Sequence, residues 1–293
     1  MIVLEQLING LALGGVYALI ALGFTLIFGV LRLFHMSHGD VFMFSGYLVI
    51  SVAVFGFGSL PLPIAILLGM AIAAVIGMGV ERVAFRPYRK SNEIIPLISG
   101  IGMSLILQNL AILIWGPGQI NYHLESGIGD FKLGSIQMSG VRIVILLACV
   151  VIVFLFNYWL YKTRTGRAVR ATAIDPETAS MMGIRPTMII LITFAVGSAL
   201  AGAATVLVGA LYGAIYPSFG FSMGLKAFAA SMLGGLGNMT GAVLGGLILG
   251  VLEVFTAGYV NVAYQDAIAM TILIGVLLIR PNGILGKSVE EKL

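Results

Sequence analysis

Charged residues are scarce in this chain of 293 residues: they make up 10% of it, whereas hydrophobic residues make up 59%. A soluble domain carries roughly 25% charged residues, so the composition excludes an ordinary soluble globular protein. The single cysteine, Cys149, excludes an intrachain disulfide. Positions 1–25 contain no Lys or Arg, so the basic region of a cleaved signal peptide is missing and the first apolar segment is expected to remain.

Apolar runs of membrane-spanning length fill most of the chain. A transmembrane helix needs about 20 predominantly apolar residues. Eight runs come close to that length or exceed it, at 4–31, 41–57, 62–80, 94–115, 141–161, 188–212, 240–258 and 266–279. A ninth, glycine-rich run at 225–237 is shorter. The sequence therefore predicts an all-α polytopic transmembrane helix bundle, one domain over 1–293, with eight full spans and one short or broken helix.

The cationic residues predict the orientation of this bundle, because Lys and Arg are enriched in cytoplasmic loops. With the N-terminus outside, 13 of the 16 Lys and Arg residues lie inside, and the exceptions are Lys132, Arg142 and Lys226. Eight crossings alone would return the positively charged C-terminus to the outside. If the short 225–237 run also crosses, the C-terminus lies inside. The prediction is an N-out, C-in topology without nucleic-acid binding.

A basic stretch at 162–187 differs from everything around it. It carries five of the cations together with Asp175 and Glu177. Asp175-Pro176 is typical of a helix start, and Gly183 of a helix stop. We expect a short cytoplasmic helix from about Pro176 to Met182, with an apolar surface formed by Ala179, Met181, Met182 and Ile184. A small apolar surface on a soluble loop indicates a docking site rather than a merely solvated loop.

Within this stretch, residues 177–183 match the pattern E-A-A-x-x-x-G in all but the middle position, and Gly166-Arg-Ala-Val-Arg170 precedes them. This segment resembles the ATPase-coupling segment of bacterial ABC importer permeases. Further motifs spread over nearly the whole chain look like the branched-chain amino-acid permease family, and most closely its H-type subunits. They are LGGVYAL at 13–19, ERVAFRP at 81–87, IGMSLILQN at 101–109, GLKAF at 224–228, LGGLG at 233–237 and GILG at 283–286.

The resemblance implies a multi-pass permease of the bacterial inner membrane that forms half of a translocation path. Its implied partners are a homologous second permease, two cytoplasmic ATP-binding subunits, a periplasmic substrate-binding protein and membrane lipid. By this resemblance, Glu177, Ala179 and Gly183 correspond to the positions at which the family's permeases contact the ATPase. Charge, capping and the apolar surface add Arg167, Arg170, Asp175 and Ile184 to the same coupling site.

Polar residues deep in apolar runs are candidates for the translocation path, because such groups are costly in a membrane. These are Gln108, Asn109 and Glu253, for each of which hydrogen bonding between helices is at least as strong an alternative. His38 and Asp40 are added because they lie at the start of the second run. Together with His35 they could in principle bind a metal, but capping of the second span or lining of the path is preferred. No metal or other cofactor is predicted.

No nucleotide site is predicted for the chain itself. Residues 286–288, Gly-Lys-Ser, look like the end of a phosphate-binding loop, but the required earlier glycine position is Pro281. The chain is therefore expected not to be an enzyme, and ATP hydrolysis is assigned to partner subunits. Two alternatives remain: an ABC permease for another small solute, such as urea or short amides, and a stand-alone secondary transporter. The latter requires coupling-ion carboxylates at mid-membrane, for which Glu253 is the one candidate.

Overall fold

The computed structural model describes residues 2–54, 60–89, 91–92, 94–121, 131–133, 136–280 and 282–286. The helices that belong to candidate membrane spans are α1 (Ile2–Leu31), α3 (Leu62–Val80), α4 (Ile94–Trp115), α5 (Gly140–Lys162), α8 (Pro186–Tyr212), α10 (Met239–Tyr259) and α11 (Gln265–Ile279). The other α-helices are α2 (His38–Val52), α6 (Arg164–Ile174), α7 (Pro176–Met181) and α9 (Phe219–Gly234).

Minor elements join these helices. A π-helix (Glu81–Phe85) and a 3-10 turn (Arg86–Tyr88) continue α3, and a second 3-10 turn (Val262–Tyr264) precedes α11. The strands are β1 (Ile120–Asn121), β2 (Phe131–Leu133), β3 (Ile136–Met138) and β4 (Ala214–Ile215). They form two antiparallel pairs, β1 with β4 and β2 with β3. Each strand is only two or three residues long, so these pairs close loops and form no layer of their own.

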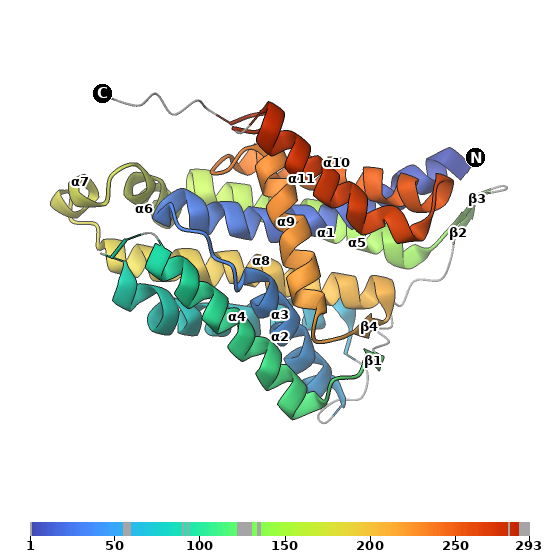
Figure 1. The fold of residues 1–293 in the computed structure, drawn as a ribbon, viewed down its shortest axis with the longest axis horizontal. Coiled ribbons are helices and arrows are strands. Elements are labelled where there is room, and N and C mark those ends of the chain that lie inside the picture. The colour runs from blue at the N-terminus through green and yellow to red at the C-terminus, as the bar shows by residue number, and fades with distance from the viewer. Residues whose placement is uncertain are drawn as a thin grey trace.

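Seven helices among the described residues are long and apolar enough to cross a membrane, one fewer than the eight full spans predicted. The difference is the run at 41–57, which forms the 15-residue helix α2. The chain leaves α1 and runs toward the middle of the molecule before α2 begins (Figure 1). His38, the first residue of α2, is completely buried. The helix α2 therefore begins inside the molecule, after the non-helical residues 32–37.

The short ninth run forms α9, a helix of 16 residues. At about 1.5 Å per residue it is roughly 24 Å long, less than the roughly 30 Å hydrocarbon core of a bilayer. Figure 1 shows α9 steeply inclined to α1 and α8. The helix ends where Gly235 and Gly237 adopt positive φ angles of 105° and 82°. The prediction of a short helix in this region is therefore confirmed, although the helix lies a few residues earlier than 225–237.

The centre of the bundle is α1, of which the most apolar 18-residue stretch is 89% buried. It packs against α5, α8, α9 and α10. It packs most extensively against α10, where a Cβ atom added to Gly250 would lie 2.3 Å from the Cα of Gly14. The small-residue spacing along both helices thus permits direct contact of the two backbones.

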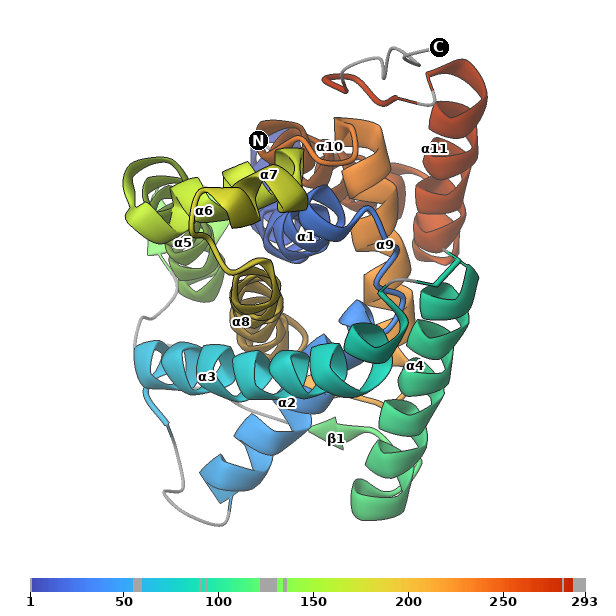
Figure 2. The ribbon, with the colours of Figure 1, turned by 90° about the vertical axis from the view of Figure 1, so that its left-hand side faces the viewer.

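The two ends of the molecule differ in content. Figure 1 shows the start of α1, the four strands and the turn between α10 and α11 at one end of the long axis. The opposite end carries α6 and α7, together with the end of α1 and the start of α8. Seen from that end, α6 lies across the ends of α1 and α5, and α4 and α11 form one side of the bundle (Figure 2). The start of α1 and the α6–α7 segment therefore lie at opposite ends of the long axis.

Candidate functional site

The basic stretch forms two consecutive helices, of which sequence reasoning predicted only the second. Thr163 caps α6 by accepting a hydrogen bond from the backbone N–H of Gly166 at 3.0 Å. Gly166, Val169 and Thr172 are buried, which gives α6 one inward face at helical spacing. A Cβ on Gly166 would lie 2.3 Å from the carbonyl oxygen of Leu160, so the tight turn from α5 into α6 requires glycine. The recurrence of small or apolar residues at every third position, 166, 169 and 172, was the sequence signal that could have predicted α6.

The second helix, α7, begins and ends as its sequence predicts. The Asp175 carboxylate accepts a hydrogen bond from the Glu177 N–H at 2.9 Å and another from the Thr178 hydroxyl. The hydrogen bond from Thr178 and then the one from Glu177 hold the pKa of Asp175 below its ordinary value. After α7, Gly183 adopts φ = 80°, and the Ile184 N–H donates to the Ala179 carbonyl at 3.1 Å. This is the Schellman arrangement that satisfies carbonyl groups at a helix end.

The apolar surface of α7 differs in part from the prediction. Ala179 is only 4% exposed, and Ile184 is partly buried against the core. These two side chains face inward because they hold α7 against the rest of the chain. The exposed apolar atoms belong instead to Met181 and Met182, which are 86% and 80% exposed, and to Ile174 at the end of α6, which is 86% exposed.

The polar residues assigned to the coupling site differ in their surroundings. Glu177 and Arg167 are exposed. Arg170 is held against α5, where its guanidinium donates to the Leu160 carbonyl at 2.5 Å and lies 5.0 Å from the centre of the Tyr161 ring. Arg170 therefore fixes α6 to the end of α5 in this structure.

Asp40 and Gln108 are brought together in the interior by α2 and α4. The Asp40 side chain is 1% exposed and accepts hydrogen bonds from Gln108 Nε2 at 2.9 Å and from the Ser104 hydroxyl. Gln108 also donates to Ser104 at 3.3 Å. These three residues form one polar cluster between two helices. Ser104 was missed at the sequence level because a serine in a membrane helix often bonds its own backbone and gives no distinct signal.

Asn109 does not join this cluster. It lies on the exposed side of α4, where its amide donates to the Leu105 carbonyl of the same helix at 2.8 Å. Neighbouring residues on a helix point about 100° apart, so Gln108 and Asn109 cannot share one face. The two neighbouring residues therefore lie in different surroundings, Gln108 in the polar cluster and Asn109 on the exposed side of α4.

His35 and His38 are buried beside the Asp40 cluster, with their ring centres 5.4 Å apart. Among the described residues, neither ring nitrogen of His38 has a hydrogen-bond partner. The ring of Phe24 lies edge-on to His38 at 6.2 Å. The Asp40 carboxylate accepts its hydrogen bonds from Ser104 and Gln108 of α4 and not from the histidines. Within the described part of the chain, no group of three His, Cys, Asp or Glu residues that could hold a metal ion is present.

Glu253 belongs to a second buried polar cluster, which joins four helices. Its carboxylate, 1% exposed, accepts hydrogen bonds from the Tyr17 hydroxyl at 2.8 Å and from Lys226 Nζ at 2.6 Å. Lys226 also pairs with Asp266 at 2.8 Å, and the Asp266 side chain is 75% exposed. Lys226 was counted above among the cations outside the membrane, but the structure places it in α9 with its charge paired inside the bundle. Only the fold could show that Lys226 and Glu253 meet.

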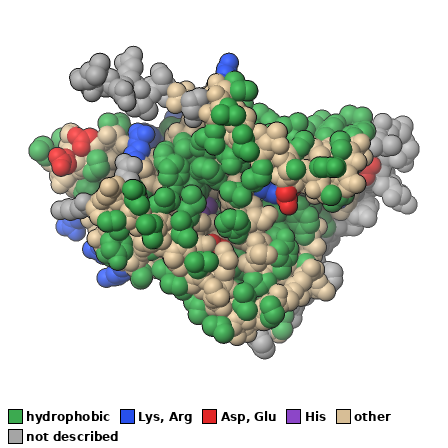
Figure 3. All heavy atoms as spheres, viewed as in Figure 1, with side chains coloured by type: hydrophobic (Ala, Val, Ile, Leu, Met, Phe, Trp, Pro, Cys, Tyr) green, Lys and Arg blue, Asp and Glu red, His purple; other side chains and the backbone are tan. Residues whose placement is uncertain are grey.

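The surface of α9 between α4 and α11 is the side on which these clusters come closest to the exterior; we call it the α9 face. Phe221 on this helix is 60% exposed, and Leu225 and Phe228 are partly exposed. Figure 3 shows histidine and acidic atoms on this side of the molecule, and a cationic group beside an acidic one near α11. The α9 face thus combines exposed apolar side chains with charged and polar groups.

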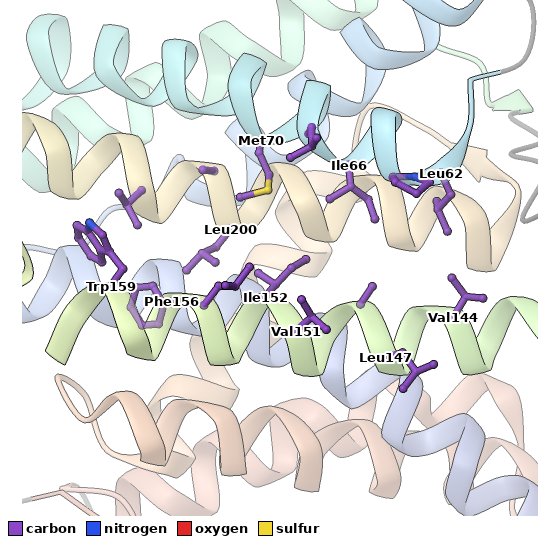
Figure 4. Close-up of a pocket in the computed structure, with 16 residues that line it drawn as sticks. Leu62, Ile66, Met70, Val144, Leu147, Val151, Ile152, Phe156, Trp159 and Leu200 are labelled. Carbon is purple, nitrogen blue, oxygen red and sulfur yellow. The ribbon is translucent and has the colours of Figure 1, made fainter. Parts of the chain in front are cut away.

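A separate groove of about 770 Å³ lies between α3 and α5, with α8 at its floor. Figure 4 shows Leu62, Ile66 and Met70 of α3 opposite residues of α5 that include Val151 and Trp159. Almost all of its lining side chains are apolar. Such a groove has no groups that could bind the charged ends of an amino acid, so it is a poor candidate for a path.

Comparison with known proteins identifies the family. The model of the branched-chain amino acid transport system / permease component family matches residues 6–277. The chain belongs to this family. It is 41% identical over 300 residues to the high-affinity branched-chain amino acid transport system permease protein BraD of Pseudomonas aeruginosa, covering 99% of this chain and 97% of that protein. The LivH permease protein of the corresponding Salmonella typhimurium system is 38% identical over 299 residues, covering 99% and 97%.

A more distant relative is the probable branched-chain amino acid transport permease protein LivH of Methanocaldococcus jannaschii, 28% identical over 283 residues, with 92% of this chain and 88% of that protein covered. The resemblance predicted from the sequence motifs is confirmed. The protein is a multi-pass membrane permease subunit of the ABC importer class. The two buried clusters and the α6–α7 segment are therefore features of a permease.

Proposed function

We propose that this permease forms half of a translocation path for branched-chain amino acids. In this proposal it pairs with a homologous second permease and two cytoplasmic ATP-binding subunits in the bacterial inner membrane, and a periplasmic binding protein delivers the substrate. Identity of 41% along nearly the whole chain to a permease named for high-affinity branched-chain amino acid transport is the observation that carries the substrate class.

The orientation proposed is N-out and C-in, with the 162–187 segment in the cytoplasm. Two observations support it. Lys162, Arg164, Arg167 and Arg170 gather at the end of the bundle that carries α6 and α7, and Lys and Arg favour the cytoplasmic side. The start of α1 lies at the opposite end, and so does the turn between α10 and α11.

The coupling role proposed for α7 is supported by its shape. A helix that is capped at both ends and protrudes from the bundle can transmit a push from a partner without unfolding. Met181 and Met182 supply an exposed, adaptable apolar contact, and Glu177 supplies a charge beside it. Ala179 and Ile184 connect this contact to the bundle. Arg170 is a positioning residue in this proposal, since it fixes α6 to α5.

The path proposed runs along the α9 face and is completed by the second permease. A branched-chain amino acid carries two charges and an apolar side chain. Phe221 and Leu225 offer apolar surface for the side chain, and the exposed carboxylate of Asp266 offers a negative charge for the amino group. His38, Asp40, Gln108 and Glu253 then stabilise the helices behind the path, whereas Asn109 on the outside of α4 is left without a role in it.

Gly183→Asp tests the proposal directly. A side chain at φ = 80° is strained, so the substitution disrupts the end of α7 while the space around Gly183 stays open. We expect leucine uptake to be lost in cells that carry the complete transport system, with normal amounts of the chain in the membrane. Gly79→Ala is the matched control, since a Cβ there also meets nothing within 4 Å and it lies inside α3. Uptake that survives Gly183→Asp would contradict the coupling role, and uptake of urea or short amides in place of leucine would contradict the substrate class.

A further inference from the structure

A pocket of about 710 Å³ lies at the α6 end of the molecule, where α1, α5, α6 and the start of α10 meet. Two arginines line it, Arg32 from the end of α1 and Arg170 from α6. None of the described residues that line it is Asp or Glu. Two cationic groups that line the same pocket without a carboxylate favour the binding of an anion.

Arg32 occupies an unusual position. It ends α1 with φ = 59°, a left-handed conformation that is uncommon for a residue other than glycine. Its backbone N–H still donates to the Phe28 carbonyl at 2.8 Å, so the last turn of α1 is complete before the chain departs. Arg170 uses its contact with Leu160 for only one of its five N–H donors. Both arginines therefore have donors to offer within the pocket.

An apolar groove of about 320 Å³ begins one helical turn away from this pocket. On α5, Asn157 is the last residue that lines the groove, and Leu160 is the first that lines the pocket. On α10 the groove reaches Val243, and the pocket begins at Met239. Spacings of three and four residues place these side chains on the same face of each helix. The groove and the pocket thus follow one another along the space between α5 and α10, over α1.

The groove itself suits a hydrocarbon chain. Asn157 is the one lining residue with an amide, and that amide donates to the Val153 carbonyl of its own helix at 3.0 Å. Apart from Gly15, which has no side chain, and the thiol of Cys149, the remaining lining side chains are apolar. Figure 2 shows α5 on the other side of α1 from α4 and α11. The groove therefore opens on a different side from the proposed path.

We propose that an anionic phospholipid binds here, with an acyl chain in the groove between α5 and α10 and its phosphate at Arg32 and Arg170. Basic pockets between membrane helices at the cytoplasmic side recognise anionic headgroups in this way. A helix of a partner protein is a poorer occupant, because its apolar surface would leave both arginines without a counter-charge. The site is independent of the cargo and of ATPase docking, but Arg170 places it beside the helix that precedes α7. Lipid composition would thereby influence how firmly α6 is held.

The test uses the purified full-length chain in detergent and native mass spectrometry with phosphatidylglycerol or phosphatidylcholine of the same acyl length. We expect preferential binding of phosphatidylglycerol. Arg32→Asn combined with Arg170→Gln should weaken it by roughly fivefold for each arginine, and asparagine suits the left-handed conformation at position 32. Val150→Trp should weaken binding as well, because Val150 lines the groove and is 59% exposed, so the bulky ring fills the groove without disturbing the core.

Arg82→Gln combined with Arg86→Gln is the matched control. Both residues are exposed and follow α3 at the same end of the molecule, outside the pocket. Phosphatidylglycerol binding should change less than twofold in this control. The proposal would be overturned by equal binding of the two lipids or by an equal loss of binding in the control. Unchanged binding in Val150→Trp would also overturn it, because the headgroup would then bind without an acyl chain in the groove.

Discussion

At the scale of single residues, the interior polar groups of this permease act in partnerships. Asp40 is satisfied by Ser104 and Gln108, and Glu253 by Tyr17 and Lys226. Each partnership joins residues more than 25 positions apart in the chain. Buried carboxylates are tolerated only with such partners, because an unpaired charge in an apolar interior is expensive. At the molecular surface, Asp175 is likewise satisfied, but by the nearby residues Glu177 and Thr178.

Asp175 makes the start of α7 sensitive to pH. Its pKa is lowered by the Thr178 hydroxyl and then by the Glu177 N–H, so the ionised form is the capping form. A lowered pKa means that the contribution to stability is complete above the ordinary value, about 4, and is lost as the pH falls through the lowered one. We expect hydrogen exchange at the amides of α7 to accelerate in that acidic range.

Asp175→Asn is the control for this prediction, since asparagine caps a helix equally well and does not titrate. The variant should show no such acceleration once intrinsic exchange rates are divided out. The same acid response in both proteins would mean that another group controls α7.

At the scale of elements, the Glu253 cluster ties α1, α9, α10 and α11 together. Lys226 is central to it, because its ammonium group reaches both Glu253 and Asp266. The helix α9 is too short to span a bilayer comfortably and ends in glycines with positive φ. Its position therefore depends on contacts with its neighbours more than on its own length.

Lys226→Met should destabilise the protein strongly. The substitution leaves Glu253, 1% exposed, with a buried charge and the Tyr17 hydroxyl as its only remaining partner among the described residues. Removing one member of a buried pair costs about 3–5 kcal/mol. Thermal unfolding in detergent should show a large fall in the midpoint, and the double variant with Glu253→Gln should recover most of it.

Asp266→Asn supplies the contrast within the same cluster. The Asp266 side chain is 75% exposed, so loss of its charge should cost about 1 kcal/mol or less. A loss as large as that of Lys226→Met would show that Asp266, rather than Glu253, is the essential partner of the lysine.

At the scale of the whole molecule, the two ends of the bundle carry different structural elements. One end carries the strands and the turn between α10 and α11, and the other carries α6 and α7. The proposed topology places these ends on opposite sides of the membrane. The single native cysteine, Cys149, is 3% exposed, so a Cys149→Ala background gives a clean starting point for labelling.

Single cysteines at Asn261 and Ser180 test this topology in intact cells. Both positions are exposed, Asn261 in the turn after α10 and Ser180 on α7. An impermeant thiol reagent should label Asn261→Cys and leave Ser180→Cys unlabelled until the cells are permeabilised. The reverse labelling pattern would show that the bundle has the opposite orientation, with α7 outside the cell, where cytoplasmic ATPases cannot contact it.

Local interactions explain why much of the fold was predictable from the sequence. Apolar run length located the long helices, because each span must satisfy its own backbone within the membrane. The start and stop of α7 follow from Asp175, Pro176 and Gly183, whose effects act within one turn. Family motifs predicted the permease class, which the comparisons confirm. Lys287 and the rest of the Gly-Lys-Ser motif after Gly286 lie outside the described residues.

The sequence by itself determined the membrane helices, the permease family and the short capped helix α7, because hydrophobicity and capping depend on near neighbours in the chain. The tertiary structure decided which polar groups meet, namely Asp40 with Gln108 and Lys226 with Glu253, and it placed Arg32 and Arg170 around one pocket. It also turned Ala179 inward and left Asn109 outside. These outcomes depend on how helices cross and which faces they bury, and a linear pattern does not specify distances between segments far apart in the chain.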